Sequence, residues 1–410
     1  MYLTHLSLTN FRNFARLDVD FPEGVVLLVG ANAQGKTSLL EAIYFLATFV
    51  SFQAGSDREL INFLAAREPL AVGRIVAEFC RPGSEAIQTR PALHRLEARI
   101  IQETQLSNGA PRLRKEILLD GIKLKAGEAV GQFNAVIFLP QTLRVIEGPP
   151  DERRRYLNLT LAQVIPHYAA HLANYHRVLS QRNALLKQIS ERGGDPTQLD
   201  YWDEQLVASG AFLIHARIQA VRDLERLATL RHHELTQGRE ILRLSYEPAF
   251  DPLPKPTKQI ALPVDTPLDR TGIPLSKIQQ GFLEALQRAR GEETSRGVTT
   301  IGPHRDELRF LGNGVDLGTY GSRGQARTAV LALKLAEMNW IKEKTGQSPV
   351  LLLDEVLAEL DTQRRADLLA RVTQSEQALL TTTDLDLFPP EFVHRAVLWR
   401  VEAGRLLGME

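Results

Sequence analysis

The sequence has little cysteine, no long apolar run and no excess charge, and each shortage excludes a class of protein. Cys80 is the single cysteine in 410 residues, so neither an intrachain disulfide nor a cluster of metal-binding thiolates can form, as is usual in a reducing compartment. No segment approaches the roughly 20 continuous apolar residues of a membrane helix, and the N-terminus has no basic stretch followed by an apolar one. We therefore expect a cytoplasmic protein without a membrane partner.

The charge of the whole chain favours no partner, because 49 basic residues offset 49 acidic ones. Binding to nucleic acid would therefore need a local basic face. Hydrophobic residues make up 44% of the chain and charged residues 24%, as in an ordinary folded protein. The length predicts two domains, or one large α/β domain with an insertion.

Strand-like and helix-like patterns follow one another at both ends of the chain. Residues 2–9 and 16–21 alternate apolar and polar side chains, and residues 25–29 form an apolar run that ends at Gly30, which indicates a buried central strand before a helical segment. Further strands are expected at 93–100, 134–138, 350–353, 378–382 and 396–401, a helix at about 324–343, and hairpins at Asp120-Gly121, Asn313-Gly314 and Ala403-Gly404. This is the pattern of a mixed α/β sheet.

The middle of the chain has a different period. From residue 151 to about 233, large apolar residues recur mostly every three or four positions, with a break at 193–196, which predicts an αα-hairpin. At 1.5 Å per residue, helices of roughly 40 residues would reach about 60 Å. Two helices that pack only on each other would form an arm, with His232 and His233 on its surface. The expected division is a head from 1–150 and 276–410, a helical arm at 151–247, and a proline-rich linker or loop at 248–275.

The loop after the first buried strand carries the pattern GxxxxGK[ST]. It consists of Gly30, Ala31, Asn32, Ala33, Gln34, Gly35, Lys36 and Thr37, and Ser38 follows it. Between a strand and a helix, its glycines let backbone N–H groups and the helix N-terminus face the phosphates of ATP. Lys36 is expected to bridge the β- and γ-phosphates, and Thr37 to hold Mg²⁺. An ordinary glycine turn is the alternative, disfavoured because both the motif and its position fit.

A second apolar strand, at 350–353, ends in two acids. Asp354 is expected to join Thr37 at the metal, and Glu355 to polarise the attacking water as the catalytic base. Four apolar residues followed by two acids are weak evidence alone, and strong evidence beside the phosphate loop.

Residues 320–325 (YGSRGQ) precede a helix and resemble the ABC signature Ser-Gly-Gly-Gln, with Arg323 in place of one glycine. Since the phosphate loop already holds the chain's own nucleotide, an anion site at Ser322 predicts a head-to-tail homodimer, in which each signature closes on the other subunit's γ-phosphate. A surface loop with a helix-capping serine is the alternative. Residues 359–361 match the D-loop that crosses such an interface. The residues expected to act in trans are Ser322, Arg323, Gly324, Gln325 and Asp361.

Three further segments resemble the RecF family of ABC/SMC-head-type ATPases: residues 8–14 (LTNFRNF), 302–307 (GPHRDE) and 149–158 (PPDERRRYLN), the last with Asn158 where the family usually has an acid. The resemblance implies a mixed-sheet ABC-ATPase head with an inserted helical arm, ATP and Mg²⁺ as cofactors, and Arg12 at the ATP site. It also implies DNA binding at single-strand gaps or stalled forks, with RecR, RecO and RecA as partners.

Two segments depart from relatives of this type, and the first is 138–143, which stands where the family usually has an acidic pair after the proline. Gln141 could reach Mg²⁺ and the attacking water, although an ordinary polar residue at a strand end fits equally well. Residues 381–383 are all threonine, where transporter-type ABC proteins have a histidine, so slow hydrolysis is expected.

Candidate DNA contacts are clustered cations, since phosphate binding needs positive charge on one face. They are Arg112, Arg114, Lys115, Lys123 and Lys125 in and beside the hairpin at Asp120-Gly121, together with Arg153, Arg154 and Arg155. For any one of them, a solvated surface charge is at least as good an interpretation.

Three rival functions fit less well. A transporter ATPase places its signature shortly after the Q-loop, whereas Ser322 lies 181 residues (322 − 141) beyond Gln141. An SMC-like DNA-organising ATPase, the main alternative, has hundreds of coiled-coil residues between its halves. A small-molecule P-loop kinase would explain neither the signature nor the D-loop.

Overall fold

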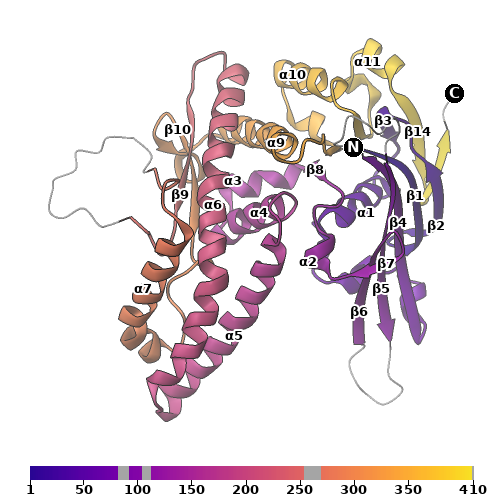
Figure 1. Ribbon diagram of the computed structural model, residues 1–410. Helices are drawn as coiled ribbons and strands as arrows, with labels where there is room; N and C mark the ends of the chain where they lie inside the picture. Colours follow the sequence, from indigo (N-terminus) through magenta and orange to yellow (C-terminus); the bar gives the residue numbers. More distant parts are fainter. Residues whose placement is uncertain (82–91, 104–111, 254–268, 409–410) are drawn as a thin grey trace. The chain divides into compact units, whose positions relative to one another are not determined.

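The computed structural model describes residues 1–81, 92–103, 112–253 and 269–408 (Figure 1). Contacts divide the chain into two compact units. The first comprises Met1–Thr142 and Glu337–Glu410, and the second comprises Leu143–Ala336. The helix α9 (Arg323–Thr345) begins in the second unit and ends in the first.

A mostly parallel sheet forms the centre of the first unit, in the order β15-β14-β3-β13-β12-β8. Its strands are β3 (Gly24–Val29), β8 (Ala135–Phe138), β12 (Val350–Asp354), β13 (Gln377–Thr382), β14 (Val397–Glu402) and the antiparallel β15 (Arg405–Gly408). Parallel strands end at one edge of a sheet, which is where such folds place their ligands. The ends of β3, β12 and β8 therefore bring residues 30, 354 and 139 to the same edge.

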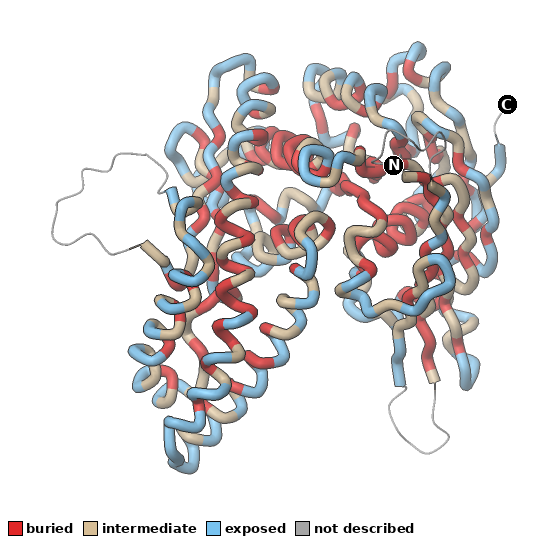
Figure 2. The backbone as a smooth tube through the Cα atoms, viewed as in Figure 1, coloured by how far each residue is buried: buried red, intermediate tan, exposed pale blue. Residues whose placement is uncertain are grey.

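An antiparallel sheet completes the first unit, in the order β2-β1-β4-β5-β6-β7. Its strands are β1 (Tyr2–Phe11), β2 (Phe14–Asp20), β4 (Leu70–Arg81), β5 (Ala92–Glu103), β6 (Arg112–Leu119) and β7 (Ile122–Leu124). The helix α1 (Lys36–Thr48) contacts strands of both sheets, and 11 of its 13 residues are buried (Figure 2). A helix that is apolar on all sides must be enclosed, so α1 fixes the loop before it. The smaller helices here are α2 (Ala126–Ala129), α10 (Thr362–Thr373) and α11 (Pro390–Arg395).

The second unit contains the predicted helical hairpin, formed by α5 (Tyr168–Arg192) and α6 (Leu199–Leu235). The first arm was predicted as one helix from residue 151, but it is shorter, because α4 (Pro150–Ala162) is a separate helix. The expectation that these helices pack only on each other is wrong, because α7 (Leu275–Arg296) contacts both of them. A three-stranded sheet, β11 (Val315–Asp316), β10 (Glu307–Gly312) and β9 (Leu242–Glu247), also packs on α6 through β9. The remaining helices are α3 (Arg144–Glu147), α4 (Pro150–Ala162) and α8 (Leu317–Tyr320).

The boundaries of the units differ from the expected division. Residues 276–336 were expected in the head, but they belong to the compact unit that contains the hairpin. His232 was expected on the surface and is buried instead. Of the expected linker, residues 254–268 lie outside the described residues, whereas Phe250 stacks on Phe282 of α7 with ring centroids 5.4 Å apart.

Buried charges tie the hairpin to α7. The guanidinium of Arg182 contacts Asp203 of α6 at 2.7 Å and Glu293 of α7 at 2.8 Å, and all three side chains are fully buried. Arg182 also donates to Thr299 Oγ1 at 2.7 Å. A buried cation is tolerated only when it is fully paired, so this arginine fixes the three helices relative to one another.

We expect the Arg182→Met substitution to destabilise the second unit by about 3–5 kcal/mol, because it removes the cation beside the buried Glu293 and leaves the buried Asp203 with Arg290 alone. Lys187→Met on the same helix is the control, since Lys187 is exposed and lies 3.8 Å from Glu191, where an ion pair contributes about 0–1 kcal/mol. Urea unfolding followed by circular dichroism measures both. Equal midpoints for the two variants would contradict the role given to Arg182.

Candidate nucleotide-binding site

The phosphate loop joins β3 to α1 and needs its two glycines. A Cβ atom at Gly30 would lie 2.4 Å from the carbonyl oxygen of Val401, and one at Gly35 would lie 2.5 Å from Nδ2 of Asn13. Gly35 also has a φ of 118°, which an L side chain rarely adopts. The sequence pattern therefore reflects close packing around the loop as well as its curvature.

Lys36 curls back over the loop that precedes it. Its Nζ donates to the carbonyl oxygens of Gly30 at 2.7 Å and Ala31 at 3.1 Å, and it lies 3.1 Å from Oε1 of Glu355. Lys36 carries the positive charge that phosphate binding requires. It therefore lies next to the proposed catalytic base, Glu355.

Asp354 lies at the end of β12, between two threonine hydroxyls. Thr37 Oγ1 is 2.9 Å and 3.0 Å from its two carboxylate oxygens, and Thr381 donates to Oδ1 at 2.7 Å. Burial raises the pKa of Asp354 above its ordinary value, although both hydrogen bonds oppose this rise. A buried carboxylate and a neighbouring hydroxyl offer hard oxygen ligands, which Mg²⁺ prefers. Asp354 and Thr37 therefore fit a Mg²⁺ site.

Glu355 has an unusual backbone. Its φ is 51°, in the left-handed region, and its N–H donates to Thr381 Oγ1 at 3.0 Å. Such strain in a residue other than glycine is costly and occurs mostly at functional sites. The strained turn directs the carboxylate of Glu355 toward Lys36.

Arg12 supports the opposite side of the loop. Its guanidinium makes a two-pronged contact with the buried Glu41 of α1, at 2.7 Å and 2.8 Å, and donates to the carbonyl oxygen of Glu59 at 3.1 Å. The neighbouring Asn13 donates to the carbonyl oxygen of Gln34 at 3.0 Å. Arg12 therefore positions α1 and also borders the pocket.

These elements enclose a pocket of ≈ 600 Å³ whose walls all belong to the first unit. The predicted residues that line it are Arg12, Asn32, Ala33, Gln34, Gly35, Lys36, Thr37, Ser38, Gln141, Asp354 and Glu355. Gly30 and Ala31 contribute carbonyl oxygens to Lys36. The other lining residues were not predicted at the site, and they are Asn13, Gln53, Glu59, Ile61, Phe63 and Pro140. Asn13 lay within the motif at 8–14, and Pro140 lay within the segment 138–143 that departs from the family pattern.

The signature residues lie in the second unit, at the start of α9. Gln325 N–H donates to Ser322 Oγ at 3.2 Å, and Ser322 N–H donates to Gln325 Oε1 at 3.0 Å, which is a reciprocal cap. Ser322, Arg323 and Gly324 are exposed. Asp361 caps α10 in the first unit by accepting from Arg364 N–H at 3.0 Å. The capping role expected as an alternative is therefore present, and action in trans stays a prediction.

Comparison with known proteins gives the family. Residues 2–390 match the RecF/RecN/SMC N terminal domain. A DNA replication and repair protein RecF from Roseiflexus castenholzii is 41% identical over 99% of both chains. The Bacillus subtilis RecF is 36% identical over 99% of this chain and all of its own. The chain belongs to the RecF family.

Solved structures agree with this assignment. A structure of the recombination mediator protein RecF with ATP, in the RecFOR pathway, superimposes with a TM-score of 0.79 at 30% identity over 100% of this chain and 98% of its own. An SMC head domain from Pyrococcus furiosus gives a TM-score of 0.51 at 16% identity over 100% of this chain and 96% of its own, which shows the shared fold alone. The predicted ABC/SMC-head type of mixed α/β fold is confirmed.

A RecF-family motif in the second unit, residues 302–307, has a structural basis in a buried network. Asp306 accepts from Arg217 Nη1 at 2.7 Å and from the N–H of Ala249 at 2.9 Å, and Tyr246 donates to it as well. Asn158 accepts from Arg217 at 3.0 Å and from Tyr168 at 2.9 Å, so it still serves as an acceptor where the family usually has an acid. Burial lowers the pKa of His304 to about 4, which leaves this histidine neutral at pH 7.

Three of the cations predicted to contact DNA instead form ion pairs or hydrogen bonds within the protein. Lys115 donates to the carbonyl oxygen of Phe49 at 2.7 Å and pairs with Asp57 at 2.8 Å. Arg153 pairs with Glu307 at 2.6 Å, and Arg154 donates to the carbonyl oxygen of Asp306 at 2.7 Å. The side chains of these cations are at most 23% exposed, so their placement favours structural roles.

The other cations predicted to contact DNA are exposed, but an acidic side chain lies close to two of them. Lys123 is 2.8 Å from Glu116, and Arg114 is 3.7 Å from the same carboxylate. Arg112, Lys125 and Arg155 are also exposed. A DNA contact by the hairpin remains a prediction, and its positive charge is partly neutralised.

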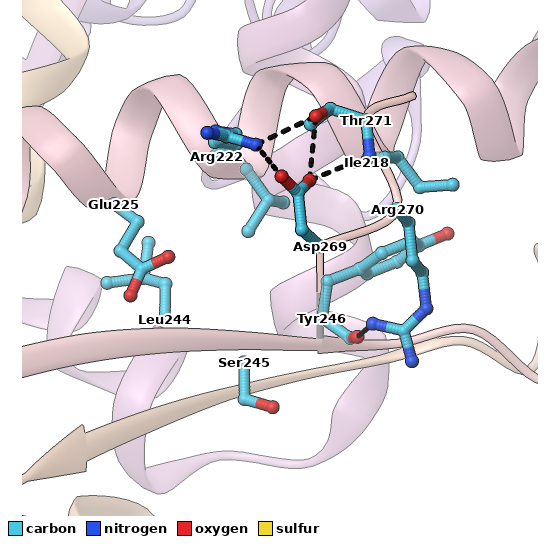
Figure 3. A pocket seen from close by; sticks show the side chains of 10 residues that line it. Ile218, Arg222, Glu225, Leu244, Ser245, Tyr246, Asp269, Arg270 and Thr271 are labelled. Carbon is cyan, nitrogen blue, oxygen red and sulfur yellow. Dashed lines mark hydrogen bonds and ion pairs between the residues drawn. The ribbon is translucent and has the colours of Figure 1, made fainter. Parts of the chain in front are cut away.

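A second pocket, of ≈ 390 Å³, lies within the second unit against α6 and β9 (Figure 3). Two of its charged groups contact each other, since Arg222 contacts Asp269, and Asp269 accepts from Thr271 Oγ1 at 2.7 Å (Figure 3). Glu225 and Arg270 pair with Arg243 and Asp251, which lie outside the pocket lining. Within the described part of the chain, no group of three or more His, Cys, Asp or Glu side chains could hold a metal ion. Among the same residues, no helix has the length and apolar character needed to cross a bilayer.

We expect Gly35→Ala to weaken ATP binding by at least about tenfold, because the added Cβ would displace Asn13 from the loop. Gly346→Ala is a matched control: Gly346 also has a positive φ, of 71°, but no atom lies within 4 Å of the added Cβ. Gly346→Ala should lose about 1–2 kcal/mol of stability, and Gly35→Ala should lose more, because its φ of 118° and the contact with Asn13 add strain. Calorimetric titration with ATP separates them, and equal affinities for the two variants would contradict the close-packing argument.

Proposed function

We propose that this RecF-family chain is an ATP-dependent DNA-binding ATPase of recombinational repair and replication. The observation that carries the proposal is the single pocket in which Lys36 lies 3.1 Å from Glu355 while Thr37 lies within 3.0 Å of Asp354. These are the groups that phosphate binding, metal binding and activation of water require.

In the proposed reaction, water attacks the γ-phosphate of ATP and yields ADP and inorganic phosphate. Backbone N–H groups of the loop and the N-terminus of α1 bind the phosphates, and Lys36 neutralises their charge. Thr37 and Asp354 would hold Mg²⁺, which supplies further positive charge at the phosphates. Glu355 orients the attacking water and accepts its proton, and Gln141 assists at the pocket wall. Because threonine stands at 381–383 in place of a switch histidine, turnover is slow.

ATP also joins two copies of the chain in this proposal. Ser322, Arg323 and Gly324 are exposed at the N-terminus of a 23-residue helix, where N–H groups and the helix dipole favour an anion. Each signature, with Gln325 and the D-loop residue Asp361, closes on the γ-phosphate held by the other subunit. Two Mg-ATP molecules lie between the heads, and hydrolysis releases the dimer.

The dimer would hold duplex DNA at single-strand gaps or stalled forks, mainly through its phosphates. The similarity to a recombination mediator described in the RecFOR pathway supports RecO and RecR as partners, and the family implies assistance in loading RecA. Of the predicted cations, Arg112, Arg114, Lys123, Lys125 and Arg155 are exposed, and these are proposed to contact the DNA backbone.

Glu355→Gln should bind ATP but hydrolyse it slowly, so dimers should accumulate and bind gapped duplex more tightly than blunt duplex. Sedimentation with excess Mg-ATP measures the dimer, and fluorescence anisotropy measures DNA binding with and without ATP. Glu391→Gln, on the exposed start of α11, should behave as the wild type. A Glu355→Gln protein that stays monomeric with bound ATP would refute the dimer.

Mixing Ser322→Arg subunits with Lys36→Met subunits should restore part of the ATPase activity that each variant lacks alone. In the mixed dimer, one of the two sites combines an intact phosphate loop with an intact signature. The measurement is phosphate release across a range of mixing ratios. Absence of recovery, in a mixture shown to contain heterodimers, would count against action in trans.

A further inference from the structure

The nucleotide pocket has a wall that the phosphate chemistry does not use. It forms where the turn between β1 and β2 meets residues 59–63. Arg12 N–H donates to the carbonyl oxygen of Leu60 at 2.8 Å, and Asn62 N–H donates to that of Asn10 at 2.8 Å. The pocket therefore extends beyond the phosphate loop, onto a surface joined to it by backbone hydrogen bonds.

One aromatic side chain stands out on this wall. Phe63 lines the pocket with 70% of its surface exposed, whereas Ile61, two residues earlier, is 3% exposed. Exposure of a whole phenyl ring to water is unfavourable, since burying such a side chain contributes about 1.5–3 kcal/mol. An exposed aromatic ring in a pocket is therefore a candidate for contact with a ligand.

The ring is also held in position. Asn62 Nδ2 donates to the carbonyl oxygen of Arg12 at 2.6 Å, and Asn62 Oδ1 accepts from Leu64 N–H at 3.1 Å, which fixes the backbone on both sides of Phe63. The guanidinium carbon of Arg67 lies 4.6 Å from the ring centroid. Since Arg67 covers one face, the other face is the one available for stacking.

We propose that Phe63 is the stacking platform for the purine ring of the nucleotide bound at the phosphate loop. The inference rests on the proposed function, because it assumes that the triphosphate occupies the loop. Every base has a π-face, so stacking tolerates different bases. Phe63 therefore increases affinity for purine nucleotides over the bare triphosphate and discriminates little between ATP and GTP.

Phe63 and its neighbour Leu64 could instead form an apolar patch for another protein. Leu64 is 68% exposed, nearly the same as Phe63. The pocket, however, is lined by Phe63 and not by Leu64 among the residues that the structure describes. A docking patch would use both side chains, whereas a nucleobase would use Phe63 alone, and this difference can be measured.

The test compares binding of Mg-ATP and Mg-tripolyphosphate to the full-length protein by calorimetry, at concentrations where sedimentation shows a monomer. Phe63→Ala should weaken Mg-ATP binding by about tenfold and leave tripolyphosphate affinity within about twofold of the wild type. Phe63→Trp should keep the affinity for ATP. Leu64→Ala is the matched control and should bind both ligands as the wild type does.

Three results would refute the proposal that Phe63 stacks on the purine ring. They are unchanged ATP affinity in Phe63→Ala, an equal loss of ATP and tripolyphosphate affinity in that variant, or an equal loss of ATP affinity in Leu64→Ala. A wild-type protein that bound neither ligand would contradict the proposed function itself, and the inference with it. Circular dichroism of each variant establishes that a loss of binding does not come from unfolding.

Discussion

The nucleotide site depends on a carboxylate whose burial in the fold is energetically unfavourable. Asp354 is 7% exposed, and burial of a charge is unfavourable unless partners compensate for it. Two hydroxyls, of Thr37 at the start of α1 and of Thr381 in β13, supply part of that compensation. The strand order β3-β13-β12 explains how residues more than 300 positions apart come together. Thr37, which follows the phosphate loop, and Thr381 contact this one buried group, and Glu355 follows it directly in the chain.

Buried charge organises the second unit in a similar way, without any evident chemistry. Arg182 joins three helices, and Arg217 joins α4, α5 and α6 to residues 303–306 through Asn158, Tyr168, Pro303 and Asp306. Several segments that identify the family are therefore scaffold, because an unpaired cation in the interior would destabilise the unit by several kcal/mol. Strong sequence patterns in this chain mark both reactive groups and structural arginines.

Local sequence patterns predicted much of the fold and the part of the nucleotide pocket that is proposed to bind the phosphates. The apolar runs at β3, β12 and β13, the glycine hairpins, α6 and α9 lie where period and turn chemistry indicated, but the break between α4 and α5 was not predicted. The packing of α7 on α5 and α6 could not be predicted, because an amphipathic helix does not specify which helix covers it. The strand β4 was missed since its burial does not alternate regularly. Phe63, Ile61 and Glu59 reach the pocket only through backbone pairing with the β1–β2 turn, which no short motif encodes.

The left-handed backbone at Glu355 also bears on how such a protein can change over evolutionary time. Glycine or asparagine would occupy a φ of 51° with less strain, so mutations toward a more stable chain are available at this position. Each of them would remove the carboxylate. Under the proposed mechanism, a requirement for turnover would oppose this gain in stability and favour glutamate, and a lineage that needed only to bind nucleotide would be free to lose it.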